Sequence, residues 1–463
     1  MESNRTTPAP NKMGYMNIPH LLFVMAMPMI ISMLVQAFYN VVDTYFVAQI
    51  NENAVSALSM SFPIQNLMIA LSTGMAVGIN ALLSKSLGEK NYERANAAAL
   101  NGIFIAVIGI IVFFIFGLFF TRTFFTAQTS DETIVSYGTN YLSICTIFCF
   151  GMFLQITFER LLQSTGHSFY TMISQSIGAI INIILDPIFI FGYFGLPAMG
   201  TRGAAIATVT GQICAMCLAL IFNLKINKEL KLTFRGFKPD KFVIRQILAV
   251  GVPATIMSAI GSILNFGLNM ILLKVLKSST GVSVYGIYFK LQSFVFMPVF
   301  GLVNGMVPII AFNYGARNKK RIIHTILLSI GCATAYMLTG FIIFQCMPTQ
   351  LLSIFNASNE QLRLGVYTLR IISLCFIVTG FNVIISSVFQ ALGNGMFSMI
   401  ISLSRQLIII LPLAYIFAVT LGINAMWAAF PIAELVASVL SVVFFVIIYK
   451  RQIKPLGEGY NIS

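Results

Sequence analysis

The sequence predicts an all-α integral membrane protein in which twelve transmembrane helices form two six-helix repeats. Three observations predict it: the chain has very few charged residues, long apolar runs follow one another throughout it, and its second half repeats its first. Of its 463 residues, 58% are hydrophobic and 9% are charged, whereas soluble proteins carry about 25% charged residues. Such a chain cannot cover its surface in water, which excludes a soluble enzyme, a nucleic-acid-binding module and a disordered protein.

The apolar runs are long enough for helices that cross a bilayer, which need about 20 residues each. Residues 1–19 are polar, and the run that follows is too long for a signal peptide, so we expect it to be a permanent span. The predicted spans are 20–49, 55–84, 96–120, 134–160, 169–193 and 203–224 in the first half, and 246–272, 284–313, 322–345, 361–390, 396–419 and 425–449 in the second.

Basic residues predict the orientation. Twenty Lys and Arg fall on one side of the predicted membrane, and the other side has six at most. Because Lys and Arg accumulate in cytoplasmic loops, we expect both termini in the cytoplasm and a multi-pass protein of the cell membrane. The formal charge of +14 then reflects loops near anionic lipid rather than a nucleic-acid partner.

The expected domains follow from these spans. They are a cytoplasmic N-terminal tail (1–19), an N-lobe (20–224), a basic cytoplasmic linker (225–245), a C-lobe (246–449) and a cytoplasmic C-terminal tail (450–463).

The internal repeat is visible at an offset of 227 residues. Seven identities occur without a gap between 62–94 and 289–321, where composition alone would give about two. They include Gln65 with Gln292, Gly74 with Gly301, Gly78 with Gly305 and Gly88 with Gly315. An even number of spans in each repeat gives both halves the same polarity. The halves are then related by a pseudo-two-fold axis along the membrane normal around a central cavity, as in some transporters.

Ionisable residues inside spans are costly and indicate function. In the first predicted span, Gln36, Tyr39 and Asn40 can share one helix face with Asp43. In the fifth span, Asn182 lies one turn before Asp186. Buried carboxylates of this kind are suited to carrying a proton, binding sodium or attracting a cationic substrate, although neighbouring polar groups alone can also satisfy them.

Further ionisable residues allow more than one interpretation. Glu159 precedes Arg160 near a cytoplasmic loop, where an ion pair is the simpler explanation. Lys290 and Arg405 can attract anions or pair with Glu434 and helix-end carbonyls. The repeat places no acid opposite Asp43, Glu159 or Asp186, so the acids distinguish the first half from the second.

Motifs along nearly the whole chain resemble the multidrug and toxin extrusion (MATE) family. The order of these motifs carries the resemblance: Pro28 with Asp43-Thr44, Gln163-Ser-Thr-Gly166, Asn182 to Pro187, Gly203-Ala-Ala-Ile-Ala-Thr208, Phe294-Val-Phe-Met-Pro298 and Pro431-Ile-Ala-Glu434. The likeness is to the prokaryotic branch whose coupling acids lie in the N-lobe.

The resemblance implies cation-coupled export of varied, often cationic, organic compounds. It implies a cation-coupling set of Asp43, Asp186, Asn182 and Thr208, joined here by Asn40, and it adds Tyr39 and Tyr141 to the pocket. The expected substrate-binding residues are Gln36, Tyr39, Tyr141, Glu159, Lys290 and Arg405. Glu159 stands where many relatives have Asn, and a C-lobe sodium site is not expected because 255–270 contains no acid.

The sequence therefore predicts a secondary active antiporter that works by rocker-switch alternating access. It contains no phosphate-binding loop, so an ion gradient of H+ or Na+ is the expected energy source, with no cofactor and no resident metal apart from sodium at Asp43 and Asp186. We expect a monomer in contact with membrane lipid that transports organic cations and amphiphiles. The alternatives are a flippase for a lipid-linked saccharide or other amphiphile, which needs several Arg or Lys, and a non-transporting membrane sensor.

Overall fold

The computed structural model describes residues 11–457, and within that range all the regular structure is helical. The first half contains α1 (Lys12–Tyr15), α2 (Ile18–Ala48), α3 (Glu52–Gly88), α4 (Tyr92–Phe119), α5 (Thr121–Thr126), α6 (Glu132–Ile147), α7 (Phe150–Ser164), α8 (Ser168–Phe191), η1 (Tyr193–Gly195) and α9 (Thr201–Lys225).

The second half contains α10 (Lys241–Met270), η2 (Ile271–Val275), α11 (Ser279–Gly315), α12 (Lys319–Cys346), α13 (Pro348–Ser353), α14 (Asn359–Ser373), α15 (Phe376–Ala391), α16 (Gly395–Leu403), η3 (Ser404–Ile410), α17 (Leu411–Leu421), α18 (Ile423–Met426), α19 (Ala429–Ile448) and η4 (Tyr449–Ile453). The elements η2, η3 and η4 are short π-helical segments.

These helices match the twelve predicted spans. Ten described helices are long and apolar enough to cross a bilayer, and two bent pairs supply the remaining spans. The sequence predicts 134–160 and 361–390 as continuous helices. The structure instead bends the first pair, α6 and α7, by 44° and the second pair, α14 and α15, by 48°. Both bends fall at equivalent positions of the repeat, so they belong to the architecture rather than to one local sequence.

The offset of 227 residues holds in three dimensions. The bounds of α3, α4 and α5 shifted by 227 reproduce the bounds of α11, α12 and α13 without a gap. The helices of the fifth and eleventh spans begin at Ser168 and Gly395, again 227 apart. The duplication therefore extends well beyond the seven identities visible in the sequence.

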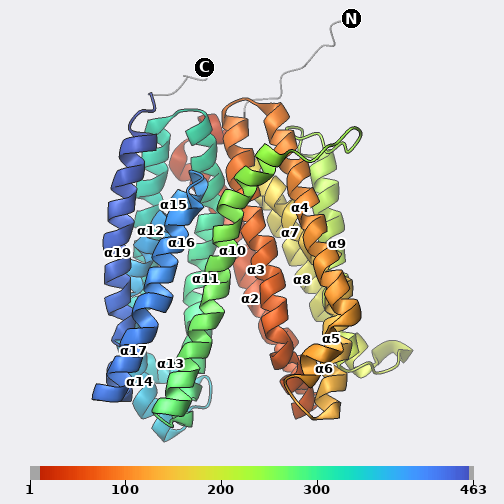
Figure 1. Ribbon diagram of the computed structural model, residues 1–463, viewed down its shortest axis with the longest axis vertical. Coiled ribbons are helices and arrows are strands. Elements are labelled where there is room, and N and C mark those ends of the chain that lie inside the picture. The colour runs from red at the N-terminus through yellow and green to blue at the C-terminus, as the bar shows by residue number, and fades with distance from the viewer. Residues whose placement is uncertain (1–10, 458–463) are drawn as a thin grey trace, which may run out of the picture.

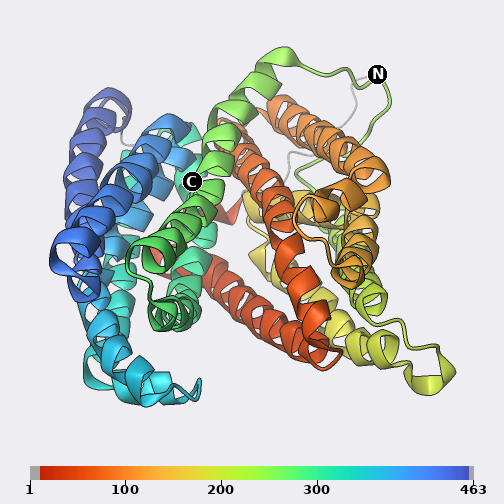
Figure 2. The same ribbon diagram turned by 60° about the horizontal axis from the view of Figure 1, so that its bottom comes forward.

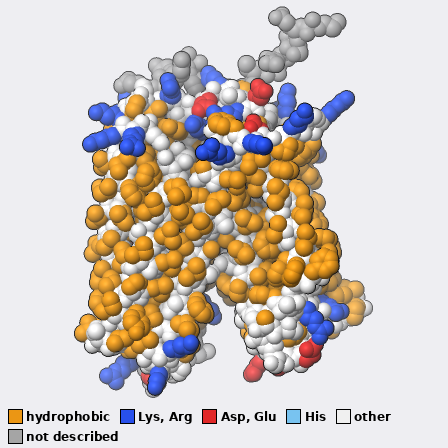
Figure 3. All heavy atoms as spheres, in the orientation of Figure 1, with side chains coloured by type: hydrophobic (Ala, Val, Ile, Leu, Met, Phe, Trp, Pro, Cys, Tyr) orange, Lys and Arg blue, Asp and Glu red, His pale blue; other side chains and the backbone are white. Residues whose placement is uncertain are grey.

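The two halves form two bundles that meet at one end and separate at the other (Figures 1 and 2). Both described ends of the chain lie at the end where the bundles meet. Figure 3 shows a hollow between the bundles at the opposite end. At the interface α2 packs against α11, and α10 packs against α3. Because α10 and α11 are the repeat equivalents of α2 and α3, a two-fold axis between the halves converts one of these contacts into the other.

Glycines allow these interface helices to approach closely. A Cβ added to Gly74 would collide with Thr255, and a Cβ added to Gly301 would collide with Ile30. Small residues at helix crossings are a common way of packing membrane helices. The repeated glycines in the sequence thus mark the contact between the lobes.

The surface is divided into an apolar belt and a basic rim. Large apolar side chains such as Phe38, Ile111, Phe266 and Val439 are mostly exposed along the spans, and Lys and Arg gather at the end that carries the chain termini (Figure 3). Exposed apolar area of this extent is stable only in contact with lipid. The protein is therefore a multi-pass membrane protein.

The chain just before α2 closes the end where the lobes meet. Asn11 donates to the Thr165 carbonyl in the first half at 3.0 Å and to Glu229 in the linker at 2.7 Å. From the second half, Arg321 donates to the carbonyls of Met13 at 3.0 Å and Met16 at 2.8 Å. The sequence predicts residues 1–19 as a tail, of which 1–10 lie outside the described residues. The remainder instead bridges the two lobes.

Candidate functional site

The acids of the first and fifth spans meet inside the first half. The carboxyl groups of Asp43 on α2 and Asp186 on α8 are in hydrogen-bond contact with each other. Asp186 is fully buried, and Asp43 Oδ1 is buried with no hydrogen-bond partner among residues 11–457. Within that range, no Lys or Arg is among the groups that act on either acid. The pair therefore has no basic side chain from residues 11–457 to balance its charge.

Asn182, Thr208 and Tyr39 surround this acid pair. With the Asn182 amide nitrogen turned toward Asp186, its Nδ2 donates to Asp186 Oδ2 at 3.0 Å. The Asn182 oxygen then accepts from Thr208 Oγ1 at 3.3 Å and from the Thr208 backbone N–H at 3.0 Å. The Tyr39 hydroxyl is also in hydrogen-bond contact with Thr208. A single network thus connects α2, α8 and α9.

Close packing of α8 on α9 creates this network. A Cβ on Gly211 would collide with the Gly178 carbonyl, and a Cβ on Gly178 would meet Ala215. One turn beyond Gly178, the same face of α8 presents Asn182, which brings its amide against Thr208. The glycine crossing therefore sets the depth at which the polar residues of the two helices meet.

Tyr141 lies beside the pair and is held by a residue that was not among the predicted site residues. Tyr141 is buried, close enough to Asp43 and Tyr39 for charge interactions, and its hydroxyl accepts from Gln65 Nε2 at 3.0 Å. Gln65 was visible in the sequence only as a repeat identity with Gln292. A polar identity between two membrane-buried helices was the signal that would have found it.

Two predicted residues of α2 do not join the network. Gln36 and Asn40 are exposed, and no hydrogen bond within residues 11–457 connects either side chain to the acid pair. The backbone carbonyl of Asn40 accepts from Thr44 Oγ1 at 2.8 Å. Helical spacing predicted that these two residues share one face of α2 with Tyr39 and Asp43. Residues three or four positions apart still cover a wide arc of the helix surface, and only Tyr39 and Asp43 point into the lobe.

Glu159 forms a separate cluster between α7 and α8. Its carboxylate accepts from Gln155 Nε2 at 3.0 Å, Ser174 Oγ at 3.1 Å and Gln175 Nε2 at 2.6 Å. Neutral donors therefore satisfy both oxygens. Arg160 instead donates to Asn304 Oδ1 at 3.0 Å across the lobe interface.

The two predicted basic residues of the second half separate from each other. Lys290 is exposed, with its Nζ 5.9 Å from the centre of the Phe355 ring. Arg405 lies inside the lobe and forms an ion pair with Glu434 at 2.8 Å. No group of three or more His, Cys, Asp or Glu side chains in the described part of the chain is arranged to hold a metal ion.

The arrangement at Asp43 and Asp186 suits reversible cation binding. Two carboxyl groups in contact cannot both be charged without strong repulsion, so a cation or a shared proton must lie between them. The surrounding amide and hydroxyl groups can reorient when that charge changes. The same site can accordingly hold a small cation in one state and attract an organic cation in another.

Comparison with known proteins agrees with this architecture. The MatE family model matches residues 28–188 and 253–416, one segment in each repeat. The chain is 24% identical over 442 residues to the multidrug export protein MepA of Staphylococcus aureus (strain NCTC 8325 / PS 47), covering 94% of both chains.

Two solved structures have the same fold. A MATE protein in complex with MaL6 has a TM-score of 0.89 at 23% identity, covering 96% of this chain and 99% of its own. The outward-facing conformation of a multidrug resistance MATE family transporter of the MOP superfamily has a TM-score of 0.88 at 24% identity, covering 94% of this chain and 96% of its own. Because the family model covers most of both repeats, the chain belongs to the MatE family of multidrug and toxin extrusion transporters, which are membrane transporters rather than enzymes and use no cofactor.

Proposed function

We propose that the protein is an antiporter that exports organic cations in exchange for protons, with Asp43 and Asp186 as the coupling groups. The observation that carries the proposal is the contact of the half-buried Asp43 with the buried Asp186, in one lobe only and without a Lys or Arg counter-ion in the described residues. Intramembrane acids with this arrangement are typical of ion pathways and proton relays.

The direct contact favours a proton over sodium as the coupling ion. A proton shared between two carboxyl groups lets their oxygens approach within hydrogen-bonding distance. A sodium ion would instead be bound between the oxygens and hold them apart. The contact between Asp43 and Asp186 therefore supports a proton as the coupling ion, and sodium at the same oxygens is the alternative that the experiment below distinguishes.

Alternating access follows from the two lobes. The hollow between the bundles opens at the end opposite the chain termini (Figure 3), and the basic rim supports a cytoplasmic location for the terminal end. With this orientation the hollow faces outward and both termini lie inside the cell. Rocking of the N-lobe (20–224) against the C-lobe (246–449), joined by the linker 225–245, would open the cytoplasmic end.

The exchange cycle uses charge at the acid pair. Protonation from outside neutralises Asp43 and Asp186 and removes the partner of a bound organic cation, which leaves. After the lobes rock, the proton is released to the cytoplasm and the charged pair attracts the next cation. Coupling works because each ligand has a different affinity for the two charge states. Tyr39 and Tyr141 supply aromatic faces suited to cations.

The flippase alternative is less well supported. A pyrophosphate-bearing substrate would need several free basic groups, but Arg405 is already paired with Glu434, and Lys290 lies against Phe355. For the assembly, we propose a monomer in lipid that carries small organic cations and amphiphiles.

The test is efflux of ethidium, an organic cation, from proteoliposomes under separately imposed proton and sodium gradients. The wild type should transport uphill with the proton gradient alone. Asp43→Asn and Asp186→Asn should each abolish uphill transport, because each variant replaces one carboxyl group of the pair by an amide that cannot take up or release the coupling proton. Equal rates in both variants and the wild type would refute the coupling assignment, and transport driven only by sodium would refute the proton.

Glu93→Gln is the matched control. Glu93 is an exposed acid of the same lobe, in the first turn of α4, and lies outside the network. We expect this variant to transport like the wild type, which separates the loss of a coupling acid from the loss of any negative charge.

A further inference from the structure

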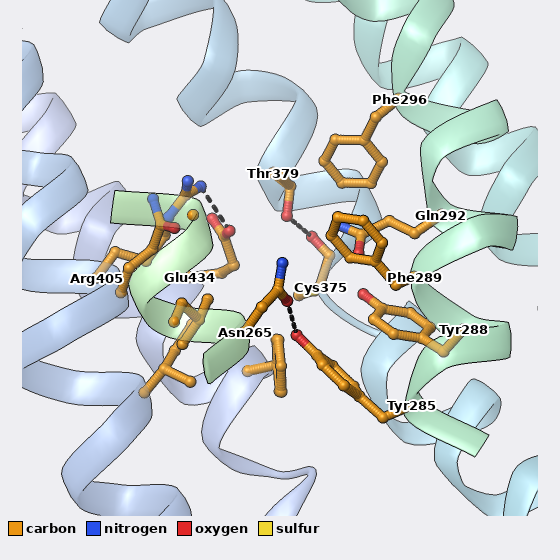
Figure 4. A pocket seen from close by; sticks show the side chains of 15 residues that line it. Asn265, Tyr285, Tyr288, Phe289, Gln292, Phe296, Cys375, Thr379, Arg405 and Glu434 are labelled. Carbon is orange, nitrogen blue, oxygen red and sulfur yellow. Dashed lines mark hydrogen bonds and ion pairs between the residues drawn. The ribbon is translucent and has the colours of Figure 1, made fainter. Parts of the chain in front are cut away.

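The second half contains a partly open cavity of about 140 Å³ that has no role in the cation exchange proposed above (Figure 4). Its walls come from α10, α11, α15, η3 and α19. Aromatic side chains and a few uncharged polar groups form most of them, and one acid and one base complete them. The lining residues used below are Tyr285, Tyr288, Phe289, Gln292, Arg405 and Glu434.

The cavity has one basic group, Arg405, and one acidic group, Glu434. Arg405 Nη1 donates to Glu434 Oε1 at 2.8 Å, and Asn382 Nδ2 donates to Glu434 Oε2 at 2.7 Å. Both carboxylate oxygens of Glu434 are therefore engaged. Ser438 donates to the Asn382 oxygen at 3.1 Å, which fixes the amide in this orientation.

Arg405 retains donors that Glu434 does not use. A guanidinium has five N–H donors, and the ion pair with Glu434 is the only contact through which Arg405 donates within residues 11–457. Its side chain is 22% exposed rather than sealed. The residue stands in the π-helical segment η3, where the wider turn displaces the side chain from the ordinary helical register.

The aromatic wall faces these donors. Figure 4 shows Tyr285, Tyr288 and Phe289 on the opposite side of the cavity from Arg405 and Glu434. The Tyr285 hydroxyl is already bonded to Asn265. The Gln292 amide has no hydrogen bond within residues 11–457 and remains available. Phe289 is 45% exposed, so the cavity is not enclosed on that side.

This arrangement favours an anion over a cation. A cation would have to approach Glu434 beside Arg405, and both oxygens of Glu434 already accept hydrogen bonds. A carboxylate, in contrast, can accept from the remaining Arg405 donors without breaking the ion pair, and Arg recognises carboxylates through parallel N–H donors. The polarity is the reverse of that at Asp43 and Asp186.

We propose that the C-lobe cavity is a second ligand site, which binds small aromatic carboxylates. The carboxylate accepts hydrogen bonds from Arg405, and the Gln292 amide supplies a further donor. The ring lies against Tyr285, Tyr288 and Phe289, where aromatic packing adds to apolar burial. The site goes beyond the proposed cation exchange and does not require the acid pair.

The test is saturation-transfer NMR on the purified full-length protein in detergent with three matched probes. Benzoate carries a negative charge, benzamide is neutral and benzylammonium carries a positive charge. We expect benzoate to bind, and Arg405→Gln to weaken it by about tenfold or more, because a charged hydrogen bond is lost. Benzamide binding should change little in that variant.

Two further variants keep the test decisive. Arg405→Gln leaves Glu434 without its ion partner, and the single variant can therefore fail to fold. The double variant Arg405→Gln/Glu434→Gln removes both charges and should fold even in that case. It should also lose benzoate binding. Lys290→Gln removes a base from the same lobe that does not line the cavity, and it should retain benzoate binding. Benzoate binding that is unchanged in the double variant, or that is lost in Lys290→Gln, would overturn the proposal.

The outcome is independent of the antiport. Asp43→Asn/Asp186→Asn should bind benzoate like the wild type, whether or not that variant transports cations. Benzylammonium binding that is lost in the Arg405→Gln/Glu434→Gln variant takes place in the C-lobe cavity. If such binding is stronger than that of benzoate, the result would also contradict an anion site.

Discussion

Gly88 at the end of α3 lies against α11, and Gly315 at the end of α11 lies against α3, across the axis between the two halves. A Cβ on Gly88 would collide with the Phe312 carbonyl, and a Cβ on Gly315 would collide with the Lys85 carbonyl. Lys85 and Phe312 are themselves 227 residues apart, as the two glycines are. The contact is thus symmetric, and it brings the ends of α3 and α11 together at the closed end of the protein.

We expect Gly315→Ala to destabilise this closed end. The added methyl meets a backbone carbonyl, which cannot move aside as a flexible side chain would, so the helices must separate at a cost of about 1–3 kcal/mol. The thermal unfolding midpoint of the purified protein in detergent should fall.

Gly331→Ala provides the matched comparison. Gly331 is a glycine of α12 with open space around its Cβ position, so alanine there should leave the unfolding midpoint unchanged or raise it slightly. Equal midpoints for the Gly315 and Gly331 variants would contradict the role of close approach.

Thr208→Val should impair transport more than it impairs folding. The hydroxyl of Thr208 connects Asn182 and Tyr39, and valine preserves its shape while removing both contacts. We expect proton-driven efflux to slow by about tenfold, because about 1–1.5 kcal/mol of hydrogen bonding is lost from the coupling network. Proteoliposome efflux measures the rate.

Thr210 on the same helix is the control for that change. Among residues 11–457 its hydroxyl bonds only to the Ile206 carbonyl within α9, at 2.7 Å. Thr210→Val should therefore transport like the wild type. If both valine variants are equally slow, the effect belongs to α9 in general and not to the network.

Glu229 makes docking of the chain before α2 sensitive to pH. Burial raises the pKa of Glu229 from 4.5 to about 7, against the opposing effects of Asn11 and the Lys12 charge. A carboxyl group with a raised pKa stabilises the docked state fully below its unfolded pKa and loses that contribution as pH rises through about 7. The loss runs from the unfolded pKa of 4.5 up to the folded pKa of about 7, so residues 11–16 should become more accessible across that range. Its upper part, between about pH 6.5 and about pH 8, is followed by proteolysis or by cysteine labelling at Met16→Cys.

The neighbouring groups set the window of that experiment. Among residues 11–457, Tyr92 and Lys12 are the charged or titratable groups that interact with Glu229, and burial lowers the pKa of Lys12. Burial and the Lys12 charge lower the pKa of His167. The contribution of His167 to stability is therefore lost as pH falls, whereas that of Glu229 is lost as pH rises. Glu229→Gln should flatten the response above about pH 6.5, and an undiminished response in that variant would exclude Glu229 as its cause.

Arg321→Ala should release the same segment from the second half. Arg321 donates to the carbonyls of Met13 and Met16 and to Asn313 Oδ1 at 2.9 Å. Loss of these bonds should weaken docking by about 1–2 kcal/mol, since charged donors form the stronger bonds. Labelling at Met16→Cys should accelerate at every pH, whereas Arg451→Ala, a change at an exposed residue in η4, should leave it unchanged.

The sequence by itself determined the fold class, because apolar length and the lack of charge leave lipid as the only compatible solvent. It also determined the duplication, and it singled out Asp43, Asp186, Asn182 and Tyr39, since an ionisable or polar side chain in an apolar run is costly wherever it points. The repeated glycines were visible in the sequence as identities between the halves, and the structure places them at the lobe interface.

Only the tertiary structure decided which of these residues meet. Periodicity put Gln36 and Asn40 on the face of Asp43, yet the packing of α2 against α8 turns Tyr39 and Asp43 inward and leaves the other two exposed. The packing of the second half likewise separated Lys290 from Arg405 and supplied Glu434 as the partner of Arg405. A sequence gives the spacing along each helix, but the rotation and depth of one helix against another depend on contacts between residues far apart in the chain, and no local pattern contains them.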